Sequence, residues 1–398
     1  MRRPIFLLGF AAALLTVNLC ISSGVYRRDA LVKRDFSKEL ELFEDALSIV
    51  QKDYVDADKI ELKKLIYGAL KGMLSDLDPY SQFMEPDEFK ELKAETQGEF
   101  GGIGVEISIK DGLLTVISPI DGTPAQKAGI KAGDKINSID GKSTKDMRLD
   151  DAVKKLRGRS GTSVKISVIR EEENKLLDFT ITRSIIKVDS IKEAKIIDDK
   201  EKIGYIKLVE FQQRTPADLD SALKKLKVQG AQALILDLRN NPGGLLDAAI
   251  EVSERFIPKD EVIVSTKGKL PSQNAVFTSQ DKGLCTDIAM IVLVNKGSAS
   301  GSEIVAGAVQ DNKRGLILGE KTFGKGSVQT VMPLKDGSAL RLTTAKYYTP
   351  NNRIIHDEGI VPDVVMEQEK EIKDGQDSQL LRAVDLLKGI KAYEKISG

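Results

Sequence analysis

The sequence predicts a multi-domain α/β protein. The chain has 398 residues, more than the roughly 100–200 residues of one ordinary domain. Helical periodicity extends over residues 35–97, short strands and glycines fill residues 98–183, and buried strands alternate with helices over residues 184–368. This alternation indicates a core with a largely parallel sheet, and in such sheets sites gather where strands end at their carboxyl side.

Residues 1–28 predict a targeting segment. Two arginines precede an uncharged stretch, residues 4–26, whose centre is continuously apolar apart from one glycine. This pattern is typical of a signal-peptide core or an inserted anchor, and no clean A-x-A cleavage motif follows it. We therefore expect an uncleaved membrane anchor and export of the rest of the chain.

The composition argues against several classes of function. Lys+Arg 60 against Asp+Glu 60 gives a formal net charge of zero, so no overall charge attracts nucleic acid. Cys20 and Cys285 have no paired spacing, which argues against a disulfide framework or a zinc site. His356 is the only histidine, so a hydrolase must either use it or work without imidazole.

Two segments at the ends of the folded region have simple interpretations. Residues 76–81 (DLDPYS) predict a turn within the helical region, because Asp-Pro disfavours helix before the proline. Residues 369–398 predict a charged tail that is helical over residues 378–396. The apolar residues of that helix share one face, which we expect to pack against another part of the protein: Leu380, Leu381, Val384, Leu387 and Ile390.

Residues 98–183 resemble a PDZ domain. The resemblance rests on a glycine-rich loop at residues 101–104 and on the tract AGIKAGDKI at residues 128–136. Successive backbone N–H groups in such a loop converge on a terminal carboxylate, and the bound peptide adds as a strand. The residues expected to bind the carboxylate are Gly101, Gly102, Ile103 and Gly104. The alternative is a glycine bulge without a function.

Two predicted strand-to-helix turns carry the candidate chemistry. Residues 237–244 (DLRNNPGG) form a tight loop with free amides, and residues 298–303 (SASGSE) put the Ser300 hydroxyl at the start of a helix. Amides and the helix dipole stabilise a negative oxygen, so the two turns together could build an oxyanion hole. The alternative is a capping box, in which Ser300 and Glu303 only satisfy the helix end. The tract lacks G-x-S-x-G, which excludes an α/β-hydrolase elbow.

Lys325 is the candidate base for Ser300. It lies between two glycines in residues 322–329 (TFGKGSVQ), a largely apolar neighbourhood. A lysine accepts a proton only when neutral, so burial must lower the pKa of the Lys325 amine well below its ordinary alkaline value. The alternative is an ordinary solvated lysine in a loop.

Residues 298–303 and 319–329 (GEKTFGKGSVQ) together resemble the carboxyl-terminal processing peptidases, also called tail-specific proteases. The resemblance covers nearly all of the exported chain, with the helical region, the PDZ module and the α/β core in the family's order. It implies an α/β protease core of the Clp protease/crotonase-like superfold with an inserted PDZ domain. It also implies a serine endopeptidase that requires no metal or organic cofactor.

The resemblance assigns roles to five residues. Ser300 would be the nucleophile, Lys325 the general base, and Gln329 would orient the lysine. The oxyanion would be held by the backbone amides of Gly301 and of Gly244, which we choose over the preceding glycine. The family usually has alanine where this chain has Gly301, a difference that leaves backbone donation intact.

Two further positions receive weaker assignments. Asp311 falls where some family members carry an acidic residue that affects activity. A carboxylate close to Lys325 would raise the pKa of the lysine, so we expect Asp311 to be structural or positioning. Residues 351–363 also look family-like and contain His356, which relieves the histidine of a role in a triad.

The resemblance also implies a setting for the protein. It would be a processing protease of the cell envelope, on the periplasmic side and anchored to the inner membrane by residues 1–28. Its partners would be unfolded or flexible protein C-terminal tails and not nucleic acid, while formation of a homo-oligomer stays open. One alternative is a catalytically silent PDZ scaffold that binds carboxyl termini, which the presence of both Ser300 and Lys325 disfavours. A second alternative is an acyl-CoA hydratase-like enzyme, because related α/β cores use glycine-turn oxyanion holes.

Overall fold

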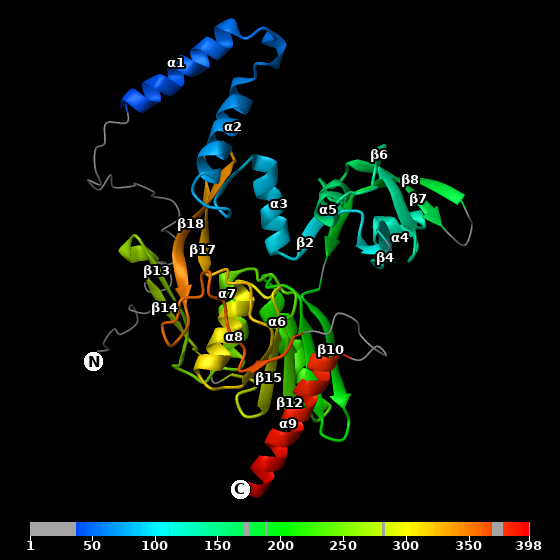
Figure 1. Cartoon of the computed structure of the whole chain (residues 1–398), viewed down its shortest axis with the longest axis vertical. Coiled ribbons are helices and arrows are strands. Elements are labelled where there is room, and N and C mark those ends of the chain that lie inside the picture. Colours follow the sequence, from blue (N-terminus) through cyan, green and yellow to red (C-terminus); the bar gives the residue numbers. More distant parts are fainter. Residues whose placement is uncertain are drawn as a thin grey trace, which may run out of the picture. The chain divides into compact units, whose positions relative to one another are not determined.

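A computed structural model describes residues 37–110, 112–170, 175–187, 189–280, 283–367 and 377–397 (Figure 1). The chain forms two compact units, of which the first ends at Ile66 and the second begins at Tyr67. The predicted targeting segment, residues 1–28, lies outside the described residues. Among the described helices, none combines the length and the apolar character needed to span a membrane.

The first unit contains the predicted N-terminal helices. Helix α1 (Ser37–Asp53) is followed by the short helix η1 (Ala57–Lys59) and by the start of α2 (Leu62–Ser75). The periodicity of the sequence predicts these helices correctly. Helix α1 has no buried residue, and its leucines Leu40 and Leu42 are 64% and 71% exposed. Several large apolar side chains of α1 are therefore exposed, namely Leu40, Leu42, Phe43, Ile49 and Val50.

The second unit begins within α2, well before the domain boundary expected at residue 97. After α2 come strand β1 (Gln82–Met84) and helix α3 (Pro86–Thr96), and β1 pairs with strand β18 (Ala339–Tyr348). The second half of the predicted helical region thus belongs to the same compact unit as the core. The predicted turn before β1 is present, and the Asp78 carboxylate accepts hydrogen bonds from the backbone amides of Tyr80 and Ser81.

The strand-rich insert joins the rest of its unit through a two-stranded ribbon. Strands β2 (Glu99–Gly102) and β9 (Ser184–Lys187) pair antiparallel, so the chain enters and leaves the insert at one place. Between them lies an antiparallel sheet with its own buried apolar core. Its elements are β3 (Val105–Lys110), β4 (Leu113–Pro119), α4 (Pro124–Ala128), β5 (Lys135–Ile139), β6 (Lys142–Ser143), α5 (Leu149–Leu156), β7 (Ser163–Arg170) and β8 (Lys175–Thr182).

The core contains the predicted parallel sheet. Its strands lie in the order β10-β11-β12-β15-β16-β19, and every neighbouring pair is parallel except β10 with β11. The bounds are β10 (Ile191–Asp198), β11 (Ile203–Leu208), β12 (Ala233–Asp237), β15 (Ala289–Val294), β16 (Leu316–Gly319) and β19 (Val364–Val365). Strands β12 and β15 are followed by the two turns that carry the candidate chemistry.

Helices cover both faces of this sheet. Helices α6 (Thr215–Val228), α7 (Leu246–Glu254) and α8 (Gly301–Asp311) pack on the face that carries Leu234 and Leu236 of β12. The opposite face, with Ala233 and Ile235, packs against α9 (Ser378–Ser397). Burial on both faces explains why the strands read as nearly continuous apolar runs.

The C-terminal helix α9 packs against the core mainly with the expected face, since Leu380, Val384 and Leu387 all belong to this contact. Ala383 and Leu387 are fully buried against the sheet, whereas Leu381, expected on the contact face, is 48% exposed. Arg239 Nη2 donates to Asp377 Oδ2 ahead of α9 and to Asp237 Oδ2 at the end of β12, each at 2.6 Å. This buried ion pair fixes the start of α9 beside the turn that follows β12.

A second, antiparallel sheet completes the core. Its strands lie in the order β1-β18-β13-β14, and β17 also pairs with β18. The remaining bounds are β13 (Val262–Gly268), η3 (Pro271–Gln273), β14 (Ala275–Thr278) and β17 (Ser327–Pro333). Because β17 begins two residues after Lys325 and β18 pairs with β1, this sheet brings the turn before β1 close to that lysine.

Candidate active site

Ser300 lies on a strained turn between β15 and α8. It has φ +52° and ψ −109°, unusual values for a residue with a side chain. Such strain persists only where the surroundings hold it, and it clusters at functional sites. Here Ser298 Oγ donates to the Leu238 carbonyl at 2.8 Å, and Ser302 Oγ donates to the Asn241 carbonyl at 2.9 Å. The turn of Ser300 is thus bonded on both sides to the turn that follows β12.

The turn after β12 touches Ser300 directly. A Cβ atom on Gly243 would lie 2.7 Å from Ser300 Cβ and 2.8 Å from Gly301 N, so only glycine fits at this contact. Gly243 N already donates to Asn241 Oδ1 at 2.9 Å. In contrast, the N–H groups of Gly244 and Gly301 have no acceptor in the part of the chain that the structure describes. Two unused amides beside a serine are the arrangement that an oxyanion requires.

Phe211 supports both of these amides. Its N–H donates to the Gly243 carbonyl at 2.9 Å, and its carbonyl accepts from Leu245 N at 2.8 Å. These bonds leave the N–H of Gly244 directed away from Phe211. On the other side, the Phe211 ring would lie 3.0 Å from a Cβ atom on Gly301. Phe211 is a supporting residue that the sequence does not reveal.

Glu303 ties Ser300 to the loop of Lys325. Its buried carboxylate accepts four hydrogen bonds, from Ser300 N (2.8 Å), Thr322 Oγ1 (2.6 Å), Gly324 N (2.7 Å) and Lys325 N (2.9 Å). Only half of the capping box is present, because the Glu303 carboxylate accepts from Ser300 N but no hydrogen bond from the Ser300 side chain caps α8 in the described structure. Glu303 does more than cap the helix, because the same carboxylate also fixes the backbone of the lysine loop.

Lys325 is partly buried, and its amine has no acceptor among the described residues. Its Nζ lies 4.9 Å from the centroid of the Tyr80 ring. Burial lowers the pKa of the Lys325 amine, the positive charge of Arg341 lowers it further, and Glu303 acts in the opposite direction. No hydrogen bond joins Lys325 Nζ to Ser300 Oγ within the described parts of the chain.

Gln329 lies beside the lysine with an unused acceptor. Its Nε2 donates to Ser327 Oγ at 3.2 Å and to Thr343 Oγ1 at 2.8 Å. Its Oε1 is buried without a hydrogen-bond partner among the described residues. A buried acceptor of this kind is costly unless a donor reaches it in another state of the protein.

One cavity of about 370 Å³ brings together four of the five predicted catalytic residues, namely Ser300, Lys325, Gln329 and Gly244. Gly301 adjoins it through its contact with Gly243. The remaining lining residues are Leu92, Glu95, Thr96, Glu210, Phe211, Pro242, Gly243, Leu245, Leu246, Ser327, Val328, Val331, Arg341 and Tyr347. The glycine turn, the serine and the lysine loop thus share one cleft.

Asp311 and His356 lie outside this cavity. Asp311 pairs with Arg353 and accepts a hydrogen bond from Asn351 N at 2.9 Å, so it fixes the loop after β18. The backbone of His356 packs against Gly326, where a Cβ atom would lie 2.2 Å from His356 N. Both residues therefore have structural contacts and no place in the catalytic cleft.

Three of the four predicted carboxylate-loop residues line one groove. Gly102, Ile103 and Gly104 border a space of about 170 Å³ between strand β3 and helix α5. Val153 and Leu156 of α5 supply its opposite wall. This groove suits an added peptide strand that ends at the glycine loop.

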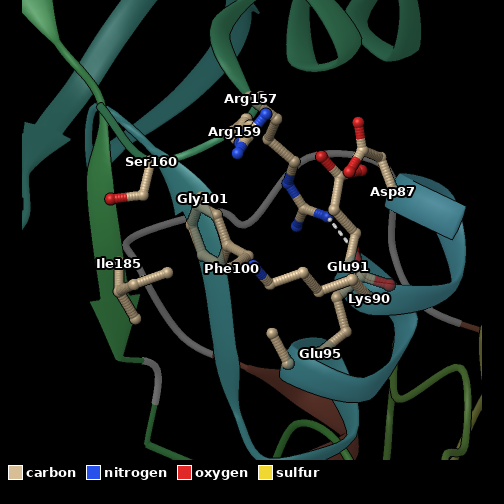
Figure 2. Close-up of a pocket in the computed structure, with 12 residues that line it drawn as sticks. Asp87, Lys90, Glu91, Glu95, Phe100, Gly101, Arg157, Arg159, Ser160 and Ile185 are labelled. Atoms are coloured by element: carbon tan, nitrogen blue, oxygen red, sulfur yellow. Dashed lines mark hydrogen bonds and ion pairs between the residues drawn. The ribbon is translucent and has the colours of Figure 1, made fainter. Parts of the chain in front are cut away.

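Gly101 lies apart from that groove. A Cβ atom on it would lie 2.3 Å from the Gly158 carbonyl, and it lines a separate cavity of about 290 Å³ beside α3 (Figure 2). In that cavity Arg157 pairs with Glu95 at 2.9 Å and lies over the Phe100 ring (Figure 2). Gly101 is needed for close packing, so its expected part in binding a carboxylate does not agree with its place.

Three family models match the chain. The model of peptidase family S41 matches residues 202–366, the PDZ domain model matches residues 115–170, and the model of the activating protease CtpB N-terminal domain matches residues 20–88. Along the chain, the matched ranges come in the order expected from the sequence: the N-terminal helical region, then the PDZ insert, then the peptidase core.

Curated relatives and a solved structure agree with these matches. The carboxy-terminal-processing protease of Bartonella bacilliformis is 45% identical over 335 residues, 83% of this chain and 76% of the relative. The carboxyl-terminal-processing protease of Synechocystis is 35% identical over 401 residues, 94% of this chain and 93% of the relative. The photosystem II D1 C-terminal processing protease has 31% identity and a TM-score of 0.52, covering 83% of this chain and 93% of that one.

Fold, site and matches together define a serine-type peptidase that carries a PDZ domain. Within that class, the chain belongs to the carboxyl-terminal processing peptidases of family S41. This confirms the predicted family and the multi-domain α/β fold class. It also removes the acyl-CoA hydratase-like alternative, because the matched core is that of a peptidase.

Gly244→Ala should lower kcat by about 10²–10³-fold, the usual loss for one oxyanion donor. At φ +147° a Cβ atom would lie 2.1 Å from the Phe211 carbonyl, so the turn must shift and its amide moves away from Ser300. Steady-state hydrolysis of an unfolded protein measures the effect. Gly389→Ala, in open space on α9, is the control and should leave kcat unchanged. Equal kcat for Gly244→Ala and the wild type would exclude this amide as an oxyanion donor.

Proposed function

We propose that the chain is an extracytoplasmic endopeptidase that recognises protein C-termini through its PDZ domain and cleaves through Ser300 and Lys325. The observation that carries the proposal is the pair of unused amides, Gly244 N and Gly301 N, beside Ser300 in a cleft that also holds Lys325. The names of the relatives, which describe carboxyl-terminal processing, support the substrate class.

In the proposed mechanism neutral Lys325 removes the proton of Ser300 Oγ, and the resulting alkoxide attacks a peptide carbonyl. The amides of Gly244 and Gly301 hold the oxyanion. As the C–N bond breaks, the leaving amine takes the proton from the Lys325 ammonium, and an ester remains on Ser300. Water, deprotonated by the same lysine, then attacks the ester. As the acyl–Oγ bond breaks, the Lys325 ammonium returns the proton to Ser300 Oγ and the carboxylic acid product leaves.

Lys325 must leave the Tyr80 ring to act as this base. The described arrangement has the amine over that ring and no hydrogen bond between lysine and serine. We infer that the lysine side chain turns toward Ser300 when substrate binds and donates to the unused Oε1 of Gln329. This gives Gln329 the orienting role expected from the sequence.

The groove between β3 and α5 would hold the tail of the substrate. A flexible C-terminal segment adds to β3 as a strand, and its carboxylate meets the amides of residues 102–104. The uncovered apolar side chains of α1 suit contact with a second copy of the chain. Residues 1–28 would anchor the protein to the inner membrane, with the peptidase on the periplasmic side.

The test uses unfolded substrates that differ only in their last residues. We expect the wild type to cleave some tails faster than others, Ser300→Ala to bind the same tails without turnover, and Val153→Arg in the groove wall to lose the preference among tails. Lys154→Ala, on the exposed side of α5, is the matched control. Cleavage that persists in Ser300→Ala would refute the mechanism, and binding without cleavage by the wild type would support the silent scaffold.

A further inference from the structure

A second cation, Arg341, lies in the catalytic cleft with Lys325. It belongs to β18, where it pairs with Gln82 of β1 and Val331 of β17, and it lines the same cavity as Ser300. Its Nε donates to the Tyr80 carbonyl at 3.3 Å, and its side chain forms no other hydrogen bond in the described structure. Burial lowers the pKa of the Arg341 guanidinium, as expected for a cation without a close counter-ion.

Tyr80 holds both cations in place. Its carbonyl accepts from Arg341, and its ring lies 4.9 Å from Lys325 Nζ. The turn that presents Tyr80 is itself fixed, because the Asp78 carboxylate accepts from Tyr80 N at 2.7 Å. Within the described chain, neither cation forms an ion pair with a carboxylate. Through the predicted turn, Tyr80 therefore contacts Arg341 with its carbonyl and Lys325 with its ring.

Two uncompensated cations in a partly buried cleft destabilise each other's charge, and the one that releases its proton more easily becomes neutral. A guanidinium does not deprotonate in proteins, so the lysine is the group that yields. The ring of Tyr80 favours the charged amine and therefore opposes this effect.

The described carboxylates around the cleft form no ion pair with either cation. Glu303 of α8 accepts from Lys325 N and favours the charged form of the amine, but its oxygens already accept four hydrogen bonds. Glu95 of α3 acts on Arg341 and is paired with Arg157. Glu210 and the Tyr347 hydroxyl complete the titratable groups that line the cavity.

We propose that Arg341, positioned by the Tyr80 turn, is the residue whose fixed charge keeps the Lys325 amine neutral and able to accept the Ser300 proton. This inference rests on the proposed Ser300 and Lys325 mechanism. Arg341 acts through the lysine and does not itself touch the reacting atoms. A catalytic lysine is often kept neutral by deep burial, and here the charge of Arg341 would supply part of that effect.

The test is the pH profile of kcat/KM for Arg341→Gln, Arg341→Lys and the wild type. Activity rises with pH as Lys325 becomes neutral, so loss of the neighbouring charge should move this rise to higher pH in Arg341→Gln. Arg341→Lys keeps a cation that titrates more readily than arginine, so its profile should lie between the other two. Lys346→Gln removes an exposed cation from the same strand, outside the cavity, and should leave the profile unchanged.

A second measurement reads the lysine without turnover. In the Ser300→Ala background, trinitrobenzenesulfonate modifies Lys325 only when the amine is neutral, and peptide mass spectrometry follows the rate. Adding Arg341→Gln should move the pH at which this rate increases to a higher value. An unshifted curve overturns the inference while leaving the proposed function intact. A raised KM with an unmoved pH profile would also overturn it and would make Arg341 a substrate-binding residue. Cleavage by Ser300→Ala would instead refute the proposed function.

Discussion

Lys325→Ala is expected to lower kcat/KM by roughly 10²–10⁴-fold, the contribution of a positioned general base. The amine lines the cavity of Ser300, and burial and the charge of Arg341 both lower its pKa. Removing it leaves the amides of Gly244 and Gly301 in place, so tail binding and the thermal midpoint should change little. Steady-state kinetics on an unfolded protein, with a melting curve for each variant, measure both quantities.

Lys325→Arg is the matched control for charge. Arginine keeps the positive charge but stays protonated and cannot accept a proton. It should therefore be as inactive as Lys325→Ala if the lysine acts as a base. Substantial activity in the arginine variant would show that only a positive charge is needed at this position, and the proposed mechanism would fail.

Glu303→Ala is expected to lower both stability and activity. Four donors lose their acceptor, from the backbone amides of Ser300, Gly324 and Lys325 and from the Thr322 hydroxyl. A buried unsatisfied donor costs about 1–3 kcal/mol, so we expect a loss of at least about 3 kcal/mol in the free energy of unfolding. The serine and lysine turns also lose their common anchor, and kcat should fall with the stability.

Denaturant unfolding and kinetics at a temperature where the variant stays folded separate these two effects. Glu303→Gln should lose less stability, because the amide oxygen still accepts hydrogen bonds. Some loss should remain, because the NH₂ group must face at least one of the four donors. Glu358→Gln, on an exposed loop, is the control and should change stability by no more than about 0.5 kcal/mol. Normal kcat in folded Glu303→Ala would show that the carboxylate is only structural.

Much of the core could be predicted because its signals are local. Strands with consecutive apolar residues, such as β12 and β15, are buried on both faces by helices, and the alternation with helices indicated this arrangement. The exposure of Leu381 on α9 could not be predicted from periodicity, because the sheet that α9 meets decides where its contact face ends. The pairing of β1 with β18 joins residues more than 250 positions apart, and no periodicity reveals it.

The site was predictable where a motif carried it. Ser300, Lys325 and Gln329 were expected from the family resemblance, and the structure places them in one cavity. The contacts of Tyr80 and Arg341 were missed, since both depend on the distant pairing of β1 with β18. The sequence predicted only that Tyr80 lies in a turn within the helical region, and nothing in it indicated contact with the lysine or the arginine.

The most direct measurement is detection of an acyl group on Ser300. The wild type is mixed with a peptide p-nitrophenyl ester, quenched in acid before the ester turns over, digested and mapped by mass spectrometry. The account predicts a mass increase equal to the acyl group on the peptide containing Ser300, and none in Lys325→Ala. Release of p-nitrophenol by the wild type without an adduct on Ser300, or with the adduct on another residue, would contradict it.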